Sequence, residues 1–190
     1  MHIEAAVLAV VVGLLRKGRL ANLGRIPFRG AYAFAIPLVF FMVAIILTYH
    51  THNEHLIRLT VRTLNVLVYV VLLGLIAINL HIREMKLMGI GAFLNFLALS
   101  ANGGAMPVSR WAAKAAGMLD YLERANGARH GIMTDGARLW PLTDLIPIPV
   151  PRLTTVLSIG DVLLAIGIFM LIQRFMCMPA PGAQHIEKTD

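Results

Sequence analysis

The chain has 190 residues, of which 58% are hydrophobic and 14% charged, against about 25% charged residues in an ordinary soluble domain. Its net charge of +7 does not indicate a nucleic-acid partner, because the basic residues flank long apolar runs, where they orient membrane proteins and meet anionic head groups. With Cys177 as the single cysteine, an internal disulfide is excluded. We predict one transmembrane domain over residues 1–178, followed by a short tail at 179–190.

Five apolar runs predict an all-α bundle of five transmembrane helices, at about residues 1–15, 31–48, 64–80, 87–101 and 156–175. Roughly 20 apolar residues cross about 30 Å of hydrocarbon as a helix, so the first and fourth runs are at the low edge of the required length. In the first run Glu4 precedes the apolar core and basic residues follow it. This is the reverse of a signal peptide, and we expect the run to be retained.

The first loop, residues 16–30, sets the expected orientation. It carries five basic residues and no acid: Arg16, Lys17, Arg19, Arg25 and Arg29. Short basic loops stay in the cytoplasm. Alternation of the spans then places the N-terminus outside, the C-terminus in the cytoplasm, and the loops at 49–63 and 102–155 outside, with an inverted topology as the alternative.

The second loop contains a histidine-rich sequence, H-x-H-x-E-H, formed by His50, His52, Glu54 and His55. Imidazole and carboxylate ligands suit zinc, copper or nickel. Alternate residues of an extended strand would bring His50 and His52 to one face. The alternative is a solvated turn without metal, because no second cluster supplies further ligands, and we expect no cofactor.

The long external segment is predicted to contain one amphipathic helix at residues 109–124. Its apolar residues recur at helical spacing, with charged residues opposite, and Ser109 is a suitable N-cap. Trp111 and Tyr121 suit head-group depth, so we expect the helix to lie in the membrane interface. The alternative is a helix packed on the loop itself.

Alternating prolines at 147, 149 and 151 follow this segment. Proline removes a backbone donor and fixes φ, which excludes a helix or a central strand there. The pattern predicts an extended, polyproline-like strap that leads into the last span. In that span Gly160 and Gly167 predict a helix-packing surface.

Asp161 is the strongest candidate for a site residue, because it lies inside the last apolar run. An ionisable group within a span is costly and is by default a functional hypothesis. The alternative is a carboxylate held by the helix N-terminus, with Arg152 as a neutralising partner. Asn95, Asn102 and Arg152 are further candidates for a ligand-binding pocket around Asp161, unless the two asparagines only join helices by hydrogen bonds.

Several motifs taken together resemble a family of small bacterial integral membrane proteins that carries only a domain-of-unknown-function label. They are G-L-L-R at 13–16, G-R-L at 18–20, N-L at 22–23, A-N-G-G-A-M-P-V-S at 101–109, I-P-I-P at 146–149, S-I-G-D-V-L-L at 158–164 and Q-R at 173–174. The resemblance covers essentially the whole chain. It implies a bacterial cell-membrane protein of about five spans and implies no activity.

From these features we expect a non-enzymatic module of the bacterial inner membrane, either an accessory subunit or a binder of a lipid or small molecule. Its pocket would face outward around Asp161 and Asn102, under the helix at 109–124. The alternative is a small transporter or channel that uses Asp161 as its coupling or selectivity group. Expected partners are membrane lipids, and either other membrane subunits or further copies of this chain.

Overall fold

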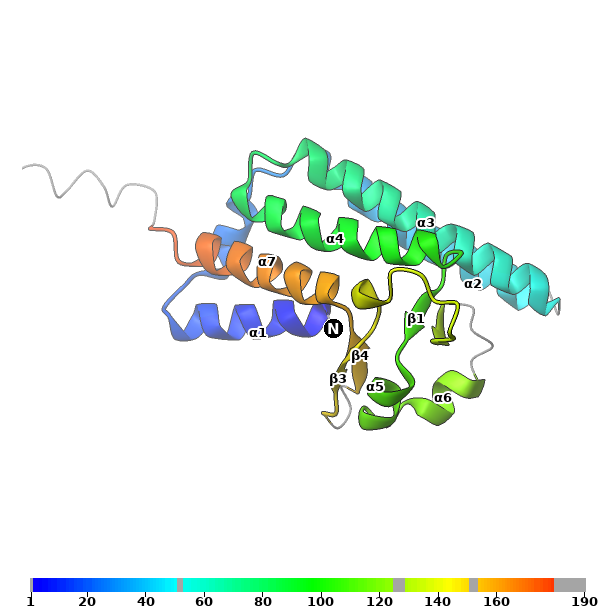
Figure 1. The fold of residues 1–190 in the computed structure, drawn as a ribbon. Coiled ribbons are helices and arrows are strands. Elements are labelled where there is room, and N and C mark those ends of the chain that lie inside the picture. Colours follow the sequence, from blue (N-terminus) through cyan, green and yellow to red (C-terminus); the bar gives the residue numbers. More distant parts are fainter. Residues whose placement is uncertain (1, 51–52, 125–128, 151–153, 180–190) are drawn as a thin grey trace, which may run out of the picture.

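The computed structural model describes residues 2–50, 53–124, 129–150 and 154–179. Long helices run side by side along one axis, and the residues between the fourth and the last of them form a small lobe at one end (Figure 1). The long helices are α1 (His2–Leu15), α2 (Ala35–His50), α3 (Glu54–Ile78), α4 (Arg83–Ala101) and α7 (Ile159–Met176). Of the described helices, α3, α4 and α7 are long and apolar enough to cross a membrane. α1 is apolar but shorter, at 14 residues, and α2 has 16.

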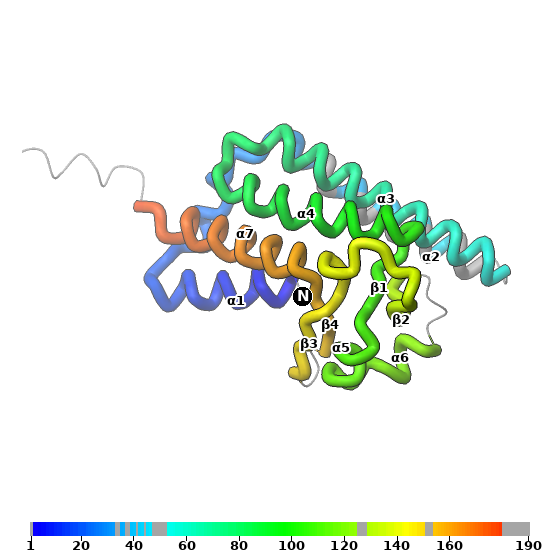
Figure 2. The backbone as a smooth tube through the Cα atoms, viewed as in Figure 1, coloured from blue at the N-terminus to red at the C-terminus, as the bar shows by residue number. Residues whose placement is uncertain are grey.

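The helices pack in an order that differs from their order in the chain. α7, the last helix, lies between α1 and α4 (Figure 2), and α4 then packs on α3 and α3 on α2. Gly160 and Gly167 lie at the α4–α7 contact, as their spacing predicts. A side-chain carbon at Gly160 would lie 2.6 Å from the carbonyl oxygen of Gly91 on α4. Small residues therefore let the two backbones approach closely, as small residues also do between membrane helices.

The predicted second loop is wrong over most of its length, because α3 begins at Glu54 and not at residue 64. The Asn53 side chain accepts hydrogen bonds from the backbone N–H groups of His55 and Leu56, which caps the helix. Arg58 and Glu54 form an ion pair of 3.2 Å one turn apart on the exposed surface. The apolar pattern did not reveal this polar first part of the helix, which is held by a cap and a charge pair.

The lobe is built from short elements around its own small core. β1 (Met106–Val108) pairs in parallel with β2 (His130–Ile132), and β3 (Ile146–Ile148) pairs antiparallel with β4 (Thr155–Leu157). α5 (Arg110–Ala115), α6 (Leu119–Arg124) and the 3-10 turn η3 (Trp140–Leu142) complete it. The core residues are Val108, Ala112, Ala113, Ala116, Leu122 and Val156.

The single amphipathic helix predicted at 109–124 is wrong, since the structure has two short helices there. Gly117 separates α5 from α6 with a φ of +72°, a left-handed conformation that glycine adopts without strain. Leu122 of α6 and Ala112 and Ala113 of α5 face the core of the lobe, as in the alternative of a segment packed on the loop itself. Trp111 and Tyr121 remain largely exposed, at 69% and 67%.

The extended, polyproline-like strap predicted from the alternating prolines is not confirmed, and Pro151 lies outside the described residues. Residues 146–148 are extended, but they form one strand of a hairpin with β4, in which Pro147 stands opposite Val156. Proline is tolerated in a strand that has a free edge, because its missing N–H can face away from the partner. The hairpin leads the chain directly to the start of α7.

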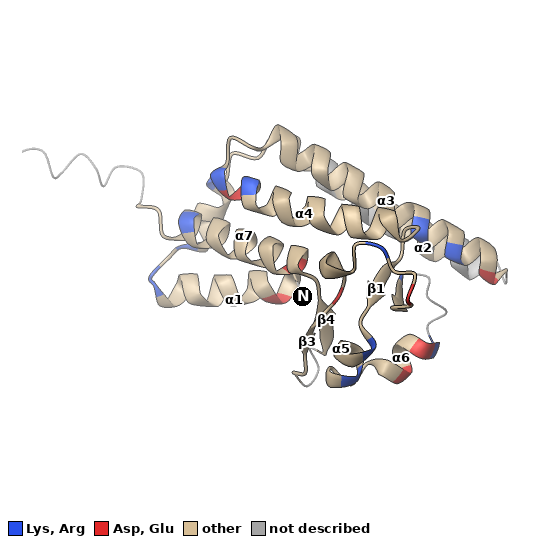
Figure 3. Cartoon of the chain, in the orientation of Figure 1, with Lys and Arg blue, Asp and Glu red and all other residues tan. Residues whose placement is uncertain are grey.

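The opposite end of the helices carries most of the basic residues of the bundle (Figure 3), in the loop at 16–30, the start of α4 and the end of α7. Glu84 is buried there between two arginines, with Arg83 Nε 2.8 Å and Arg174 Nη1 3.0 Å from its two oxygens. Arg16 donates to the side chain of Gln173 at 3.0 Å. These contacts join α1, α4 and α7 at this end.

Candidate functional site

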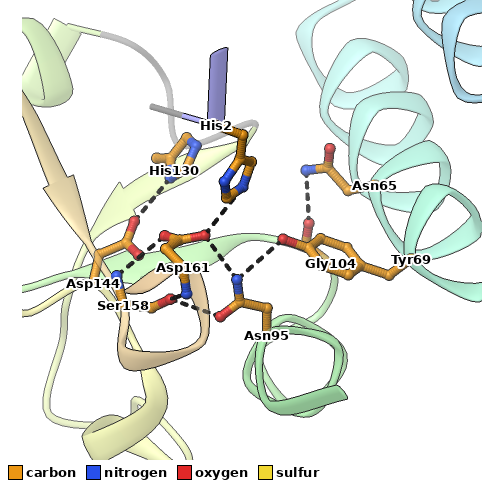
Figure 4. A network of polar contacts seen from close by, with 9 residues as sticks. All are labelled: His2, Asn65, Tyr69, Asn95, Gly104, His130, Asp144, Ser158 and Asp161. Carbon is orange, nitrogen blue, oxygen red and sulfur yellow. Dashed lines mark hydrogen bonds and ion pairs between the residues drawn. The ribbon is translucent and has the colours of Figure 1, made fainter. Parts of the chain in front are cut away.

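A polar cavity of about 120 Å³ lies where the lobe meets α1, α3, α4 and α7. We call it the polar cavity. Its lining residues are His2, Asn65, Tyr69, Leu99, Met106, Arg129, His130, Asp144 and Asp161. Six of these side chains are drawn with the network around them in Figure 4, where the carboxylates of Asp144 and Asp161 point toward the same region.

Asp161 belongs to this site, but its oxygens are already engaged. Ser158 caps α7, and the two residues form a reciprocal capping box. The backbone N–H of Ser158 donates to Asp161 Oδ2 at 3.1 Å, and that of Asp161 donates to Ser158 Oγ at 2.9 Å. Asn95 Nδ2 donates to Asp161 Oδ1 at 2.8 Å, and His2 Nε2 lies 3.7 Å from the same oxygen. Asp161 therefore anchors the start of α7.

Asn95 connects three helices beneath the cavity. It is fully buried, and its amide nitrogen also lies 3.3 Å from the Tyr69 hydroxyl on α3. Its amide oxygen accepts a hydrogen bond of 2.6 Å from Ser158 Oγ at the start of α7. Every polar atom of Asn95 thus has a partner, so this residue positions Asp161 and Tyr69 and holds the floor of the cavity in place.

Asp144 is the group that sequence reasoning missed. Its side chain is only 3% exposed, and Oδ2 lies 3.2 Å from His130 Nδ1. Its other oxygen, Oδ1, is buried and has no hydrogen-bond partner among the described residues. A buried carboxylate oxygen without a donor is costly, which makes it a marker for an external partner.

Two backbone hydrogen bonds fix the position of Asp144 and therefore orient its carboxylate. Its N–H donates to the Pro107 carbonyl at 3.0 Å, and its own carbonyl accepts from Ser109 N–H at 2.9 Å. Burial raises the pKa of the Asp144 carboxyl above its usual range. The His130 hydrogen bond and charge oppose that rise, and the nearby charge of Asp161 adds to it.

The rim of the polar cavity is more exposed than its floor. The side chains of His2 and His130 are 44% and 43% exposed, and Arg129 is exposed. Asp161 at 17% and Asp144 at 3% lie deeper. The arrangement is a small acidic recess with two imidazoles and one guanidinium at its entrance, which suits the binding of a small polar ligand.

Asn102 does not join Asp161, contrary to the predicted pocket. It ends α4 and binds the neighbouring loop: its Nδ2 donates to the carbonyls of Ala98 and Arg138, at 2.7 and 2.8 Å, and its Oδ1 accepts from Arg138 N–H at 2.9 Å. It lines a separate pocket of about 510 Å³ between α3 and the lobe. Asn102 is thus a cap and loop anchor.

The remaining predicted site residues fall largely outside what the structure describes. Arg152 and His52 are not among the described residues, and the side chain of His50, at the end of α2, is not described either. His55 is exposed in the first turn of α3. Within the described residues no group of three His, Cys, Asp or Glu side chains is placed to hold a metal ion, and the histidine metal site stays a prediction.

Comparison with known proteins gives the chain relatives but no activity. The profile of a family described as a "Family of unknown function (DUF5317)" matches residues 25–173. A protein of Thermotoga maritima, described as "Uncharacterized protein", is 31% identical over 185 residues, which cover 95% of this chain and 96% of that protein. No solved structure matches the chain.

Proposed function

The chain belongs to the DUF5317 family, and from the geometry of its own residues we propose that it is a membrane-embedded binding module whose ligand occupies the polar cavity. One observation carries the proposal: Asp144 Oδ1 is buried in that cavity without a hydrogen-bond donor among the described residues. Asp161, Asn95 and Ser158 act as the scaffold, because their mutual hydrogen bonds hold them in place, while the Asp161 carboxylate keeps acceptor sites for a ligand. A ligand that donates to Asp144 Oδ1 would satisfy the open position.

The setting of this module is a membrane, in our proposal the inner membrane of a bacterium. α3, α4 and α7 are long and apolar enough to span it. We propose that α1 and α2 cross with them, since they run along the same axis (Figure 1). The basic residues gathered at the end opposite the lobe support a cytoplasmic position for that end (Figure 3). The lobe and the polar cavity would then face outward, with lipids around the helices.

The alternative of a small transporter or channel that uses Asp161 as its coupling group has less support. A coupling carboxylate must exchange partners during transport, whereas Asp161 is held by Ser158 and Asn95 at the first turn of α7. Solute uptake by reconstituted vesicles would favour the transporter, and a larger complex after mild-detergent purification would favour an accessory subunit.

The experiment that tests the binding module is native mass spectrometry of the full chain released from mild detergent. We expect a bound small molecule or lipid in the wild type and its loss in Asp144→Asn, which keeps the shape of the side chain and removes the charge. Asp135→Asn is the matched control, because Asp135 is an exposed acid of the same lobe and does not line the polar cavity. Retention of the same ligand by Asp144→Asn at unchanged occupancy contradicts the proposal.

A further inference from the structure

We infer that the polar cavity selects a primary ammonium group, supplied either by a small free amine or by an amine-bearing lipid head group. This inference rests on the proposed binding function and adds the chemical class of the ligand. It depends on three features of the cavity: the charge of its lining, the placement of its hydrogen-bond acceptors, and its size.

The net charge of the residues that line the cavity favours a ligand with one positive charge. Asp144 from the lobe and Asp161 from α7 contribute two carboxylates, and Arg129, just before β2, contributes one guanidinium. Among the described residues, the other titratable groups that line the cavity are His2 of α1, His130 of β2 and the hydroxyl of Tyr69 on α3. With the histidines counted as neutral, the lining carries one net negative charge, which a monovalent cation would neutralise.

The acceptors are arranged for a group that has several N–H donors. Asp144 Oδ1 has no donor among the described residues, and Asp161 Oδ1, which accepts from Asn95, keeps a second lone pair on a side chain that is 17% exposed. The Tyr69 oxygen accepts from Asn95 and keeps a second lone pair. A primary ammonium carries three N–H donors, so it can bind acceptors from the lobe, α7 and α3 together.

Other cations fit these residues less well. Divalent metal ions prefer six or more oxygen ligands or a cluster of imidazole and carboxylate groups. The described part of the chain places no three such side chains together. A quaternary ammonium has no N–H donor and is recognised by several Trp, Tyr or Phe faces, whereas Tyr69 is the single residue of these types among the described residues that line the cavity.

The size of the cavity accommodates more than a bare ammonium. Its volume of about 120 Å³ is well above the roughly 10–15 Å³ that one water requires, so a short carbon chain fits behind the nitrogen. Arg129 at the exposed rim suits an anionic group that follows such a chain. An aminoethyl phosphate head group has this combination of an ammonium, a short carbon chain and an anionic group. A lipid that carries such a head group is therefore tested beside the free amine.

Proton exchange follows from the same geometry. Burial and the Asp161 charge raise the pKa of Asp144, so this carboxyl holds its proton more tightly than a solvent-exposed aspartate does. A bound ammonium needs the carboxylate, so its binding competes with the proton on Asp144. Affinity should therefore rise with pH until Asp144 is ionised in the free protein or the amine itself loses its proton.

The test is a titration of the full chain in detergent with ethanolamine, followed by thermal unfolding, against tetramethylammonium and sodium chloride at equal ionic strength. We expect a rise in Tm with ethanolamine and none with the other two salts. Asp144→Asn should weaken ethanolamine binding at least about tenfold, since a charge-assisted hydrogen bond is lost. Tyr69→Phe should weaken it less, and Asp135→Asn should leave it unchanged.

A second arm identifies the source of the amine. The chain is reconstituted in vesicles of phosphatidylcholine with or without phosphatidylethanolamine, and the rise in Tm is compared between wild type and Tyr69→Phe. A response confined to phosphatidylethanolamine assigns the site to a lipid head group, and a response confined to ethanolamine assigns it to a free amine. Either response supports the inference.

The outcomes separate this inference from the proposed function. No response in either arm, or an equal response to tetramethylammonium, overturns the ammonium class. If Asp144→Asn still loses the ligand seen by native mass spectrometry, the binding module stands with a different ligand. If that variant keeps the ligand, both proposals are wrong.

Discussion

Glu84 and Asp144 are both buried carboxylates, one at each end of the bundle, and their partners differ. Glu84 is fully buried between Arg83 and Arg174, each of which contacts a different oxygen. Asp144 has a histidine at one oxygen and no donor among the described residues at the other. The carboxylate with both oxygens paired joins elements of the fold, whereas the one with an unpaired oxygen is the group to which we assign the ligand in our proposal.

The polar residues around Glu84 and around Asp144 differ in the same way as the two carboxylates do. At the basic end Asn22 donates to the carbonyls of Met176 and Met178, at 3.1 and 3.0 Å, and so ties η1 (Leu20–Arg25) to the end of α7. At the lobe end Asn95, Ser158 and Asp161 form an equally closed network, but it ends at a cavity and not at another helix. Within the described part of the chain, the lobe end therefore combines rigid support with an acidic recess.

The largest expected loss of stability comes from removing the carboxylate of Glu84 at the basic end of the bundle. Glu84→Ala leaves the two arginines without their carboxylate, and we expect a loss of about 2–4 kcal/mol of stability, at the lower part of the range for buried pairs because both arginines are partly exposed to solvent. Thermal unfolding in detergent measures it. If Asp144→Ala lowered Tm by as much, the contrast between a structural and a binding carboxylate would be lost.

A smaller effect is expected at the floor of the polar cavity. Ser158→Ala removes the N-cap of α7 and the hydrogen bond to Asn95, at a cost of about 1–2 kcal/mol. It should also weaken ligand binding without abolishing it, because Asp144 is untouched. Ser109→Ala is the control, since Ser109 precedes α5 but makes no side-chain capping bond. Equal losses in both variants would contradict the assigned role of Ser158.

The helices could be predicted more fully than the site because the two depend on different information. Apolar length is local, and it placed α1, α4 and α7 within a few residues of their ends. The start of α3 was missed because a cap and a charge pair extend it beyond the apolar run. The break at Gly117 was missed because helical spacing of apolar residues continues across a single turn.

The residues of the candidate site also differ in whether a local sequence pattern indicates their role. The alternative of Asp161 held by a helix N-terminus has a visible signal, since Ser158 and Asp161 have the spacing of a capping box. Asp144 has none. It lies in a loop between prolines, where an acid is ordinarily solvated, and its burial depends on contacts with Pro107, Ser109 and His130 that are distant in the chain.

The smallest expected effect is a pH dependence of stability that separates the two ends further. The pKa of Asp144 is raised in the folded protein, so the folded state holds its proton more tightly than the unfolded chain does. Its contribution to stability is present below the unfolded pKa of about 4 and is lost as pH rises through the folded pKa.

Without ligand, wild type should therefore lose stability relative to Asp144→Asn as pH rises above about 4, and added ethanolamine should reduce that loss. Thermal unfolding of both proteins from pH 4 to 7 measures the difference, with Asp135→Asn as the control that should follow the wild type. A constant difference between wild type and Asp144→Asn across this range would mean that the open carboxylate titrates as an ordinary surface acid, and the contrast with Glu84 would then rest on hydrogen bonds alone.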